Sequence, residues 1–333
     1  MKNRRPILEG VKAAAHLHQE FDIRQQVESQ WTRIDVFGTI VRENIPLLFR
    51  PLDNLLGAYL PRPNQGIIIT TQRPLSVQRF TGSHELGHAA MGHEGSIDDE
   101  SLLTRSPFGS KTYEPFEIAA DSFATHFLLP RWLFVVQAAR HKWSRQDLAD
   151  PRVVYQLSLR AGASYQATCM ALLRHELIDQ ATLSRLFAVE VKKIKQLLLD
   201  GHNLETWHPD VWVLTEADEG TVIEGDSRDA FILRLKETSG AGYLWNVDQL
   251  KEAGFVLFRD ERLISDAEGD VGGPVERVVG ARSDLSQLRQ IALHQTRPWQ
   301  KNGPPLSSFS FTFDLRGKES GRPRAERRHP VAA

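Results

Sequence analysis

The spacing of apolar residues changes near Trp207, and this change limits the folds open to the chain. Before that point apolar side chains recur mainly three and four positions apart, as in residues 117–129, which is typical of amphipathic helices. After it they alternate with polar ones, as in residues 231–235 and 308–313, which is typical of strands. We therefore expect a helix-containing N-terminal part and a separate all-β domain.

Length and composition exclude several classes of protein. The chain has 333 residues and 41% hydrophobic content, so it can form two or three domains. Its formal net charge of −1 gives no argument for nucleic acid or membrane surfaces as partners. Its single cysteine, Cys169, cannot form an intrachain disulfide, and no apolar run approaches the roughly 20 residues that cross a bilayer. No apolar segment of the kind found in signal peptides follows the N-terminal basic residues. These features predict a soluble, cytoplasmic protein.

Residues 1–131 predict an α+β domain. Alternating apolar residues on both sides of a Pro- and Gly-containing spacer indicate a hairpin, and helical spacing precedes and follows it. The expected elements are two helices and a strand in residues 7–50, a hairpin of residues 57–60 and 67–70, and helices at 76–91 and 117–129.

The rest of the chain divides into three parts. Residues 132–210 predict a helical module in which Ser164 caps a helix. Residues 211–316 predict the all-β domain. Residues 317–333 are rich in Arg, Pro and Gly and contain little to bury, so we expect a disordered tail.

A His-Glu-x-x-His pattern at residues 84–88 is the main functional signal. Residues four apart lie on one face of a helix, so His84 and His88 can reach the same metal ion. A catalytic zinc ion needs three protein ligands and an open position, and Glu85 follows the first histidine as a general base must. The alternative is that this short pattern arose by chance in an ordinary helix.

The third ligand is less constrained by spacing alone. Glu117 lies in the first turn of the next long predicted helix, and Asp121 lies one turn further on, where it could accept the second N–H of a liganding histidine. Asp121 could equally be a solvated helix residue. The competing ligands are His93, Glu94, Glu114 and His126. The group that stabilises an oxyanion stays open among Tyr113, His93 and His126.

Three ordered motifs resemble the ImmA/IrrE family of metallo-endopeptidases. They are Gly66-Ile-Ile-Ile-Thr, Arg79-Phe-Thr-Gly-Ser-His-Glu-Leu-Gly-His88, and the segment from Glu117 to Pro130. The resemblance implies that His84, His88 and Glu117 bind Zn²⁺ and that Glu85 is catalytic. This sequence has Ala119 where the family often has a second acid, and Asp121 in place of an Asn.

The same resemblance implies a zincin-like fold and a protein substrate. Family members typically cleave a cytoplasmic helix-turn-helix repressor of the phage-repressor type in response to stress or a mobile element. We expect the strand at Ile67–Ile69 to form the sheet edge to which a substrate segment adds. The alternative is a non-catalytic regulator, in which the metal site is structural and other domains bind partners.

The helical module resembles the helix-turn-helix-like part of radiation-response members of the family. Lys192, Lys193 and Lys195 cluster on one turn and could contact phosphates. The charge excess of the module is mild, so we interpret the cluster as a solvated helix face and expect no direct contact with DNA.

Three segments of the β domain occur in the order of the loop motifs of chagasin-like cysteine peptidase inhibitors. The first lacks the family's Asn-Pro, and residues 261–270 interrupt the middle one. The resemblance implies an immunoglobulin-like sandwich whose loops bind a peptidase, recruit the substrate or sense a ligand. The alternative is that the aromatic residues belong to the core. The candidate loop residues are Gly242, Tyr243, Trp245, Gly272, Gly273, Arg297, Pro298 and Trp299.

Overall fold

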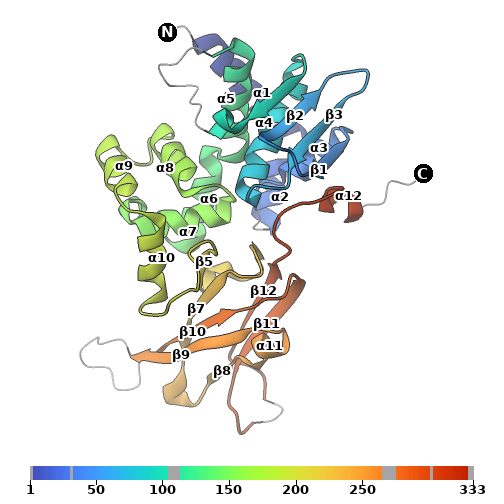
Figure 1. The fold of residues 1–333 in the computed structure, drawn as a ribbon. Coiled ribbons are helices and arrows are strands. Elements are labelled where there is room, and N and C mark those ends of the chain that lie inside the picture. The colour runs from blue at the N-terminus through green and yellow to red at the C-terminus, as the bar shows by residue number, and fades with distance from the viewer. Residues whose placement is uncertain (1–2, 31–32, 104–112, 265–274, 301–302, 329–333) are drawn as a thin grey trace. The chain divides into compact units, whose positions relative to one another are not determined.

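The computed structural model describes all residues except 1–2, 31–32, 104–112, 265–274, 301–302 and 329–333 (Figure 1). The chain divides into two compact units. Unit 1 comprises residues 1–138, 157–184 and 318–333, and unit 2 comprises residues 139–156 and 185–317.

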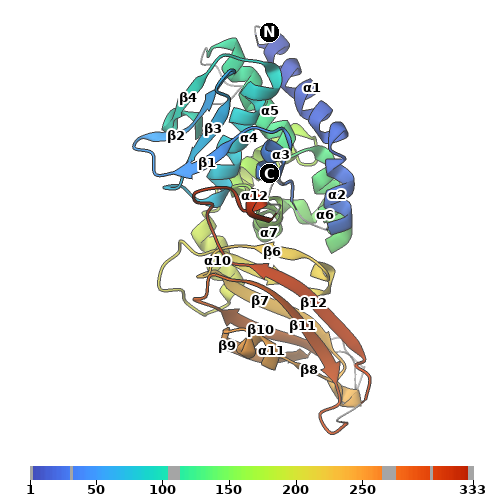
Figure 2. The same cartoon turned by 90° about the vertical axis from the view of Figure 1, so that its right-hand side faces the viewer.

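Unit 1 contains a four-stranded sheet with helices packed against it. Strand order is β1-β3-β2-β4, in which β1 runs parallel to β3 and the other pairs are antiparallel. Helix α4 packs on β2 and β3, and α5 packs on both α4 and α1 (Figure 2). The elements are α1 (Arg4–Glu20), α2 (Ile23–Gln30), α3 (Val36–Arg42), β1 (Leu47–Arg50), β2 (Leu55–Leu60), β3 (Gly66–Thr70), α4 (Leu75–Met91), β4 (Ser96–Asp99), a 3₁₀ turn (Glu100–Leu103) and α5 (Pro115–Leu128).

Several local predictions for unit 1 are confirmed. The hairpin pairs β2 with β3, with Leu60 opposite Gly66. Helices α4 and α5 begin and end within two residues of the predicted bounds, and Glu117 lies in the first turn of α5. Three helices rather than two precede β1, because α1 and α2 are separate helices.

The prediction that Ile67–Ile69 form a sheet edge is wrong. Strand β3 is an inner strand, paired with β1 on one side and β2 on the other. Its parallel partner is β1 (Leu47–Arg50). Hairpin signals in the sequence cannot reveal a parallel pairing of this kind. The edge strand beside the candidate functional helix is β4 instead.

Close packing of the helices in unit 1 depends on glycines. A β-carbon at Gly10 of α1 would lie 2.1 Å from the backbone oxygen of Ala119 on α5. A β-carbon at Gly87 of α4 would lie 2.9 Å from the Phe123 ring. The absence of side chains at these positions lets α1 and α4 each approach α5 closely, and the approach of α4 to α5 brings their polar residues together.

The prediction of a disordered tail is wrong for residues 317–328. Gly321 exchanges two backbone hydrogen bonds with Phe49 of β1, at 2.8 and 3.0 Å. The side chain of Gln78 on α4 bonds both the backbone oxygen and the backbone N–H of Glu319. Polar pairing, rather than the apolar burial that the composition lacks, therefore orders this segment, which ends in α12 (Arg324–Arg328). Residues 329–333 lie outside the described part of the chain.

The helices that follow α5 do not form a unit of their own. The division between the two units falls inside α6 (Arg131–His141), α7 (Pro151–Ala161) and α9 (Gln180–Phe187). The predicted cap at Ser164 is present, since its hydroxyl accepts the Ala167 N–H at 3.1 Å. The remaining elements are a 3₁₀ turn (Asp147–Ala149), α8 (Tyr165–Arg174) and α10 (Val191–Leu199). Helix-turn-helix character stays a prediction.

Unit 2 contains two four-stranded sheets, which agrees with the all-β domain that the alternating pattern predicted. Their orders are β5-β7-β10-β9 and β6-β12-β11-β8. Phe231 of the first sheet and Phe313 of the second have ring centroids 4.5 Å apart, so the sheets share one core. The elements are β5 (Val211–Leu214), β6 (Val222–Glu224), β7 (Ala230–Glu237), β8 (Leu244–Asn246), α11 (Asp248–Glu252), β9 (Val256–Ile264), β10 (Val275–Arg282), β11 (Leu288–Thr296) and β12 (Ser307–Asp314), with short 3₁₀ turns at Glu216–Asp218 and Ser239–Ala241.

Candidate metal centre

Helix α4 brings two imidazoles to one point. His84 and His88 lie one turn apart and are fully buried, and their Nε2 atoms are 2.9 Å apart. Two ring nitrogens this close need either a shared proton or a shared cation. The i, i+4 spacing recognised in the sequence thus produces the convergence that metal binding requires.

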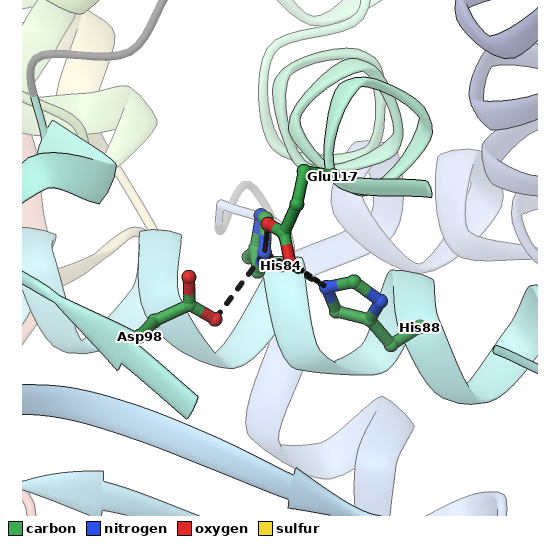
Figure 3. Close-up of side chains that lie close together, drawn as sticks. All are labelled: His84, His88, Asp98 and Glu117. Atoms are coloured by element: carbon green, nitrogen blue, oxygen red, sulfur yellow. Dashed lines mark hydrogen bonds and ion pairs between the residues drawn. The ribbon is translucent and has the colours of Figure 1, made fainter. Parts of the chain in front are cut away.

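Two carboxylates complete the group (Figure 3). Glu117 of α5 places its two carboxylate oxygens 3.3 Å from His84 Nε2 and 3.8 Å from His88 Nε2. Asp98 of β4 places Oδ2 3.4 Å from His84 Nε2. One donor atom from each of the four residues lies within 4.8 Å of the others. Ligand atoms of a tetrahedral zinc ion, with bonds of about 2.0–2.1 Å, are separated by roughly 3.4 Å, so the set fits such an ion.

The Nδ1 atoms of both histidines, which face away from the shared point, also have side-chain partners. His84 Nδ1 lies 3.0 Å from Asp121 Oδ1, which is the position expected for Asp121 from the sequence. His88 Nδ1 lies 3.0 Å from His93 Nδ1. Such contacts fix the tautomer and the orientation of a liganding imidazole, leaving Nε2 free to bind a metal.

The charge of the pocket favours a cation. Burial lowers the pKa of His84, but the carboxylates of Asp121, Glu117 and Asp98 outweigh it and raise that pKa to about 10. Several acids therefore surround a position from which water is largely excluded. A divalent cation would take the place of the imidazole proton and neutralise the acids.

Glu85 is buried beside the group, on the sheet side of α4. Its Oε2 accepts a hydrogen bond from the Ser96 hydroxyl at 2.7 Å. A β-carbon at Gly57 of β2 would lie 3.0 Å from its Oε1, so the glycine provides the space for this carboxylate. Burial raises the pKa of Glu85 well above its usual range, and His84 opposes this shift. A carboxylate with a raised pKa suits proton transfer near neutral pH.

The competing candidates fall outside the group, with one partial exception. His93 contacts His88 but contributes no atom to the four-residue set. Glu94 and Glu114 are exposed, and Tyr113 is half-buried. His126 bonds the backbone oxygen of Ser122 through Nδ1 at 2.8 Å. Of the three residues considered for the oxyanion, His93 is the one whose described contacts reach the metal group.

Sequence reasoning did not find Asp98 or Ser96. Both project inward from β4, because alternate residues of this strand are buried. No motif marks them, and their place beside α4 depends on β4 pairing with β2. Strand alternation could have selected Ser96 and Asp98 as a pair on one face, but it could not have placed that face against His84.

Two of the predicted loops of unit 2 lie together. Trp299 covers Gly242, where a β-carbon would lie 2.3 Å from the indole ring. Arg297 donates to the backbone oxygen of Ala241 at 3.2 Å, and its guanidinium lies 4.5 Å from the centre of the Tyr243 ring. Pro298 is exposed, and Trp299 is 68% exposed. We call residues 238–243 and 296–300 the loop pair.

The assignment of Trp245 to the loops is wrong. Trp245 lies in β8 and is 3% exposed, and its indole N–H donates to the backbone oxygen of Lys236 at 2.8 Å. The alternative considered from the sequence, that of a core aromatic, holds for this residue. Gly272 and Gly273 lie outside the described residues.

Two family models match separate parts of the chain. Residues 42–173 match the IrrE N-terminal-like domain, and residues 226–313 match the chagasin family of peptidase inhibitors, I42. One segment of the chain is therefore similar to IrrE/ImmA-like domains and another to chagasin-like inhibitors, as the sequence motifs predicted. The first match covers the whole metal group, and the second covers most of the two-sheet unit.

Individual relatives match between about a third and most of the chain. Amoebiasin-2 of Entamoeba histolytica is 25% identical over 107 residues, which are 32% of this chain and 86% of the relative. The cysteine protease inhibitor EhICP2 of the same organism is 25% identical, with a TM-score of 0.31 over 33% of this chain and 100% of its own. A Mycobacterium tuberculosis transcriptional regulator is 13% identical, with a TM-score of 0.29 over 83% of this chain and 81% of its own.

Among the described residues, every helix is too short or too polar to cross a membrane.

Proposed function

We propose that unit 1 is a zinc-dependent endopeptidase. The convergence of His84, His88 and Glu117, with the carboxylate of Glu85 buried beside them, is the observation that supports this most strongly. Two histidines and a glutamate are a donor set found in catalytic zinc sites of peptidases. The match to the IrrE N-terminal-like domain supports the same assignment.

In this proposal each residue of the pocket has a defined role. A bound zinc ion would polarise the scissile carbonyl and lower the pKa of a water molecule towards about 7. Glu85 takes the proton of the attacking water and later gives it to the leaving amine nitrogen. Ser96 holds the Glu85 carboxylate through its 2.7 Å hydrogen bond. Asp121 fixes His84 through Nδ1.

The proposed substrate is a cytoplasmic protein that enters as an extended segment. Strand β4 pairs with β2 along one side and belongs to the sheet edge beside the metal group, so a peptide can add to its other side. Ile97 projects outward there and is 75% exposed. The family resemblance supports a helix-turn-helix repressor as the target, in a response to stress or a mobile element, and a cytoplasmic location.

A comparison of the wild type with Glu85→Gln tests this function. The variant should keep the bound zinc and cleave a panel of helix-turn-helix repressors at least about 100-fold more slowly, because it lacks the base. Glu94→Gln, which changes an exposed acid close in sequence to the same helix, serves as the matched control and should cleave normally. Zinc content is measured by mass spectrometry and cleavage by gel electrophoresis.

Each failure of this test has a separate meaning. Equal cleavage by the wild type and Glu85→Gln would remove Glu85 from the mechanism. A zinc-loaded wild type that cuts no repressor, even with extracts of stressed cells added, would reject the proposed substrate and favour a non-catalytic regulator.

A second candidate function concerns unit 2, as a module that binds another protein through the loop pair. The exposed indole of Trp299, supported on Gly242, favours this function, because aromatic anchors dominate binding energies in protein interfaces.

Two kinds of binding partner can be distinguished by experiment: a papain-like cysteine peptidase, or the substrate or signal ligand of unit 1. Titration of the full chain and of Trp299→Ala into a papain assay separates them, since wild-type inhibition that the substitution weakens supports the peptidase. If micromolar wild-type protein does not inhibit papain, the remaining roles for the loop pair are recruitment of the substrate of unit 1 or sensing of a signal ligand.

A further inference from the structure

A fourth side chain reaches the point where His84, His88 and Glu117 converge. Asp98 is 4% exposed, and its Oδ2 lies 3.4 Å from His84 Nε2, which matches the 3.3 Å approach of Glu117 to the same nitrogen. In Figure 3 its carboxylate approaches His84 from the side opposite to His88. Its distance from His84 and its burial therefore place Asp98 as well as Glu117 to bind a cation that the histidines also bind.

We propose that Asp98 is a displaceable fourth protein ligand, so that the centre as folded here is closed to a substrate carbonyl. The inference rests on the proposed metal centre of unit 1. A catalytic zinc site keeps one of its positions free of protein ligands, whereas a site with four of them is closed. The four-residue set thus describes a latent centre that opens only when Asp98 leaves.

The charges of the pocket support coordination by Asp98. The carboxylates of Asp98 and Glu117 lie 3.4 and 3.3 Å from His84 Nε2. Glu85 is the next residue after His84 on α4, and both Asp98 and Glu85 are almost wholly buried. Buried acids this close repel one another unless a cation or protons lie between them. A divalent ion held by Asp98 and Glu117 together with the two imidazoles would remove this repulsion.

The backbone of β4 supports the same role. Asp98 pairs with Gly57 of β2 and Asp99 pairs with Leu55, so the register shifts by one residue next to Asp98. The extra residue, Leu56, belongs to β2, and such a bulge disrupts the ladder that holds β4 next to Asp98. Because β4 lies at a sheet edge, a segment that pairs with its outer side can move it and withdraw the carboxylate.

Cobalt-substituted protein and azide test the closed centre without measuring cleavage. Co²⁺ takes the place of zinc, and its visible spectrum reports the ligands, while azide binds only where a position is exchangeable. Azide should leave the wild-type spectrum unchanged and shift that of Asp98→Ala. Azide should also shift the spectrum of Asp98→Asn, which keeps the size of the side chain, because an amide is a poorer ligand for this ion. The Asp98→Ala change should also lower Co²⁺ affinity by about 10- to 100-fold or more.

Asp99→Ala is the matched control, since Asp99 is the exposed neighbour on the same strand and should behave like the wild type. A wild-type spectrum that shifts with azide as much as that of Asp98→Ala would overturn the inference. An unchanged spectrum and affinity in both Asp98 variants would also overturn it, even if the protein cleaves repressors. Failure of the wild type to bind Co²⁺ or zinc at all would instead reject the proposed function, and the closed centre with it.

Discussion

The metal group of unit 1 and the loop pair of unit 2 present their key residues in opposite ways. His84, Glu85 and His88 are fully buried and are contacted by side chains from another helix and a strand. Trp299 is 68% exposed and covers Gly242. Chemistry in unit 1 therefore depends on the correct packing of several elements, whereas a substitution of one surface side chain can change binding by unit 2 with little effect on the fold.

The largest expected effect separates two tryptophans of unit 2. Trp245→Ala should lower the free energy of unfolding by about 3–5 kcal/mol, because it empties a buried aromatic site. Trp299→Ala should change it by no more than about 0.5 kcal/mol, because the ring is largely in solvent. Urea unfolding followed by circular dichroism measures both. Equal losses would show that Trp299 is a core residue and would break the comparison.

The second effect concerns zinc affinity and tests whether the metal group depends on residues that contact its histidines. Asp121→Asn should weaken zinc binding by about 10- to 100-fold, because an uncharged partner holds His84 less firmly in its liganding tautomer. Competition with a chromogenic chelator measures the dissociation constant. Glu114→Gln, an exposed acid at the start of the same helix, should leave it unchanged. Equal affinities for all three proteins would reduce Asp121 to a structural residue.

The smallest effect concerns the C-terminal segment that Gln78 holds. The Gln78 side chain bonds the backbone oxygen of Thr70 and both backbone groups of Glu319. Gln78→Ala should lower the free energy of unfolding of unit 1 by about 1–2 kcal/mol, since buried polar groups lose partners. Gln72→Ala, at an exposed position nearby, is the control for the same denaturation curve. A loss no larger than that of the control would mean that residues 318–328 contribute nothing to unit 1.

Local spacing predicted the pair of histidines, because the helix that carries His84 and His88 brings them together. Spacing left Glu117 among several competing ligands, and the resemblance of the three motifs selected it. The hairpin of β2 and β3 was equally local, because the turn residues lie between its strands.

The parts that failed depend on pairing between distant segments. Asp98 joins the group only because β4 pairs with β2, and β3 became an inner strand only because β1 lies parallel to it. Residues 317–328 are ordered by contacts with Phe49 and Gln78, far away in the sequence. Trp245 belongs to a segment that resembles a loop motif, yet the strand on which it lies directs its side chain into the core.

Zinc content per chain tests the central claim most directly. Protein produced in medium of defined metal content is compared with His88→Ala and Glu117→Ala by mass spectrometry of the intact chain and by elemental analysis. We predict one zinc ion per wild-type chain and its loss from both variants under the same dialysis. A wild type without zinc, or variants that retain a full equivalent, would contradict the claim that His84, His88 and Glu117 form a zinc centre.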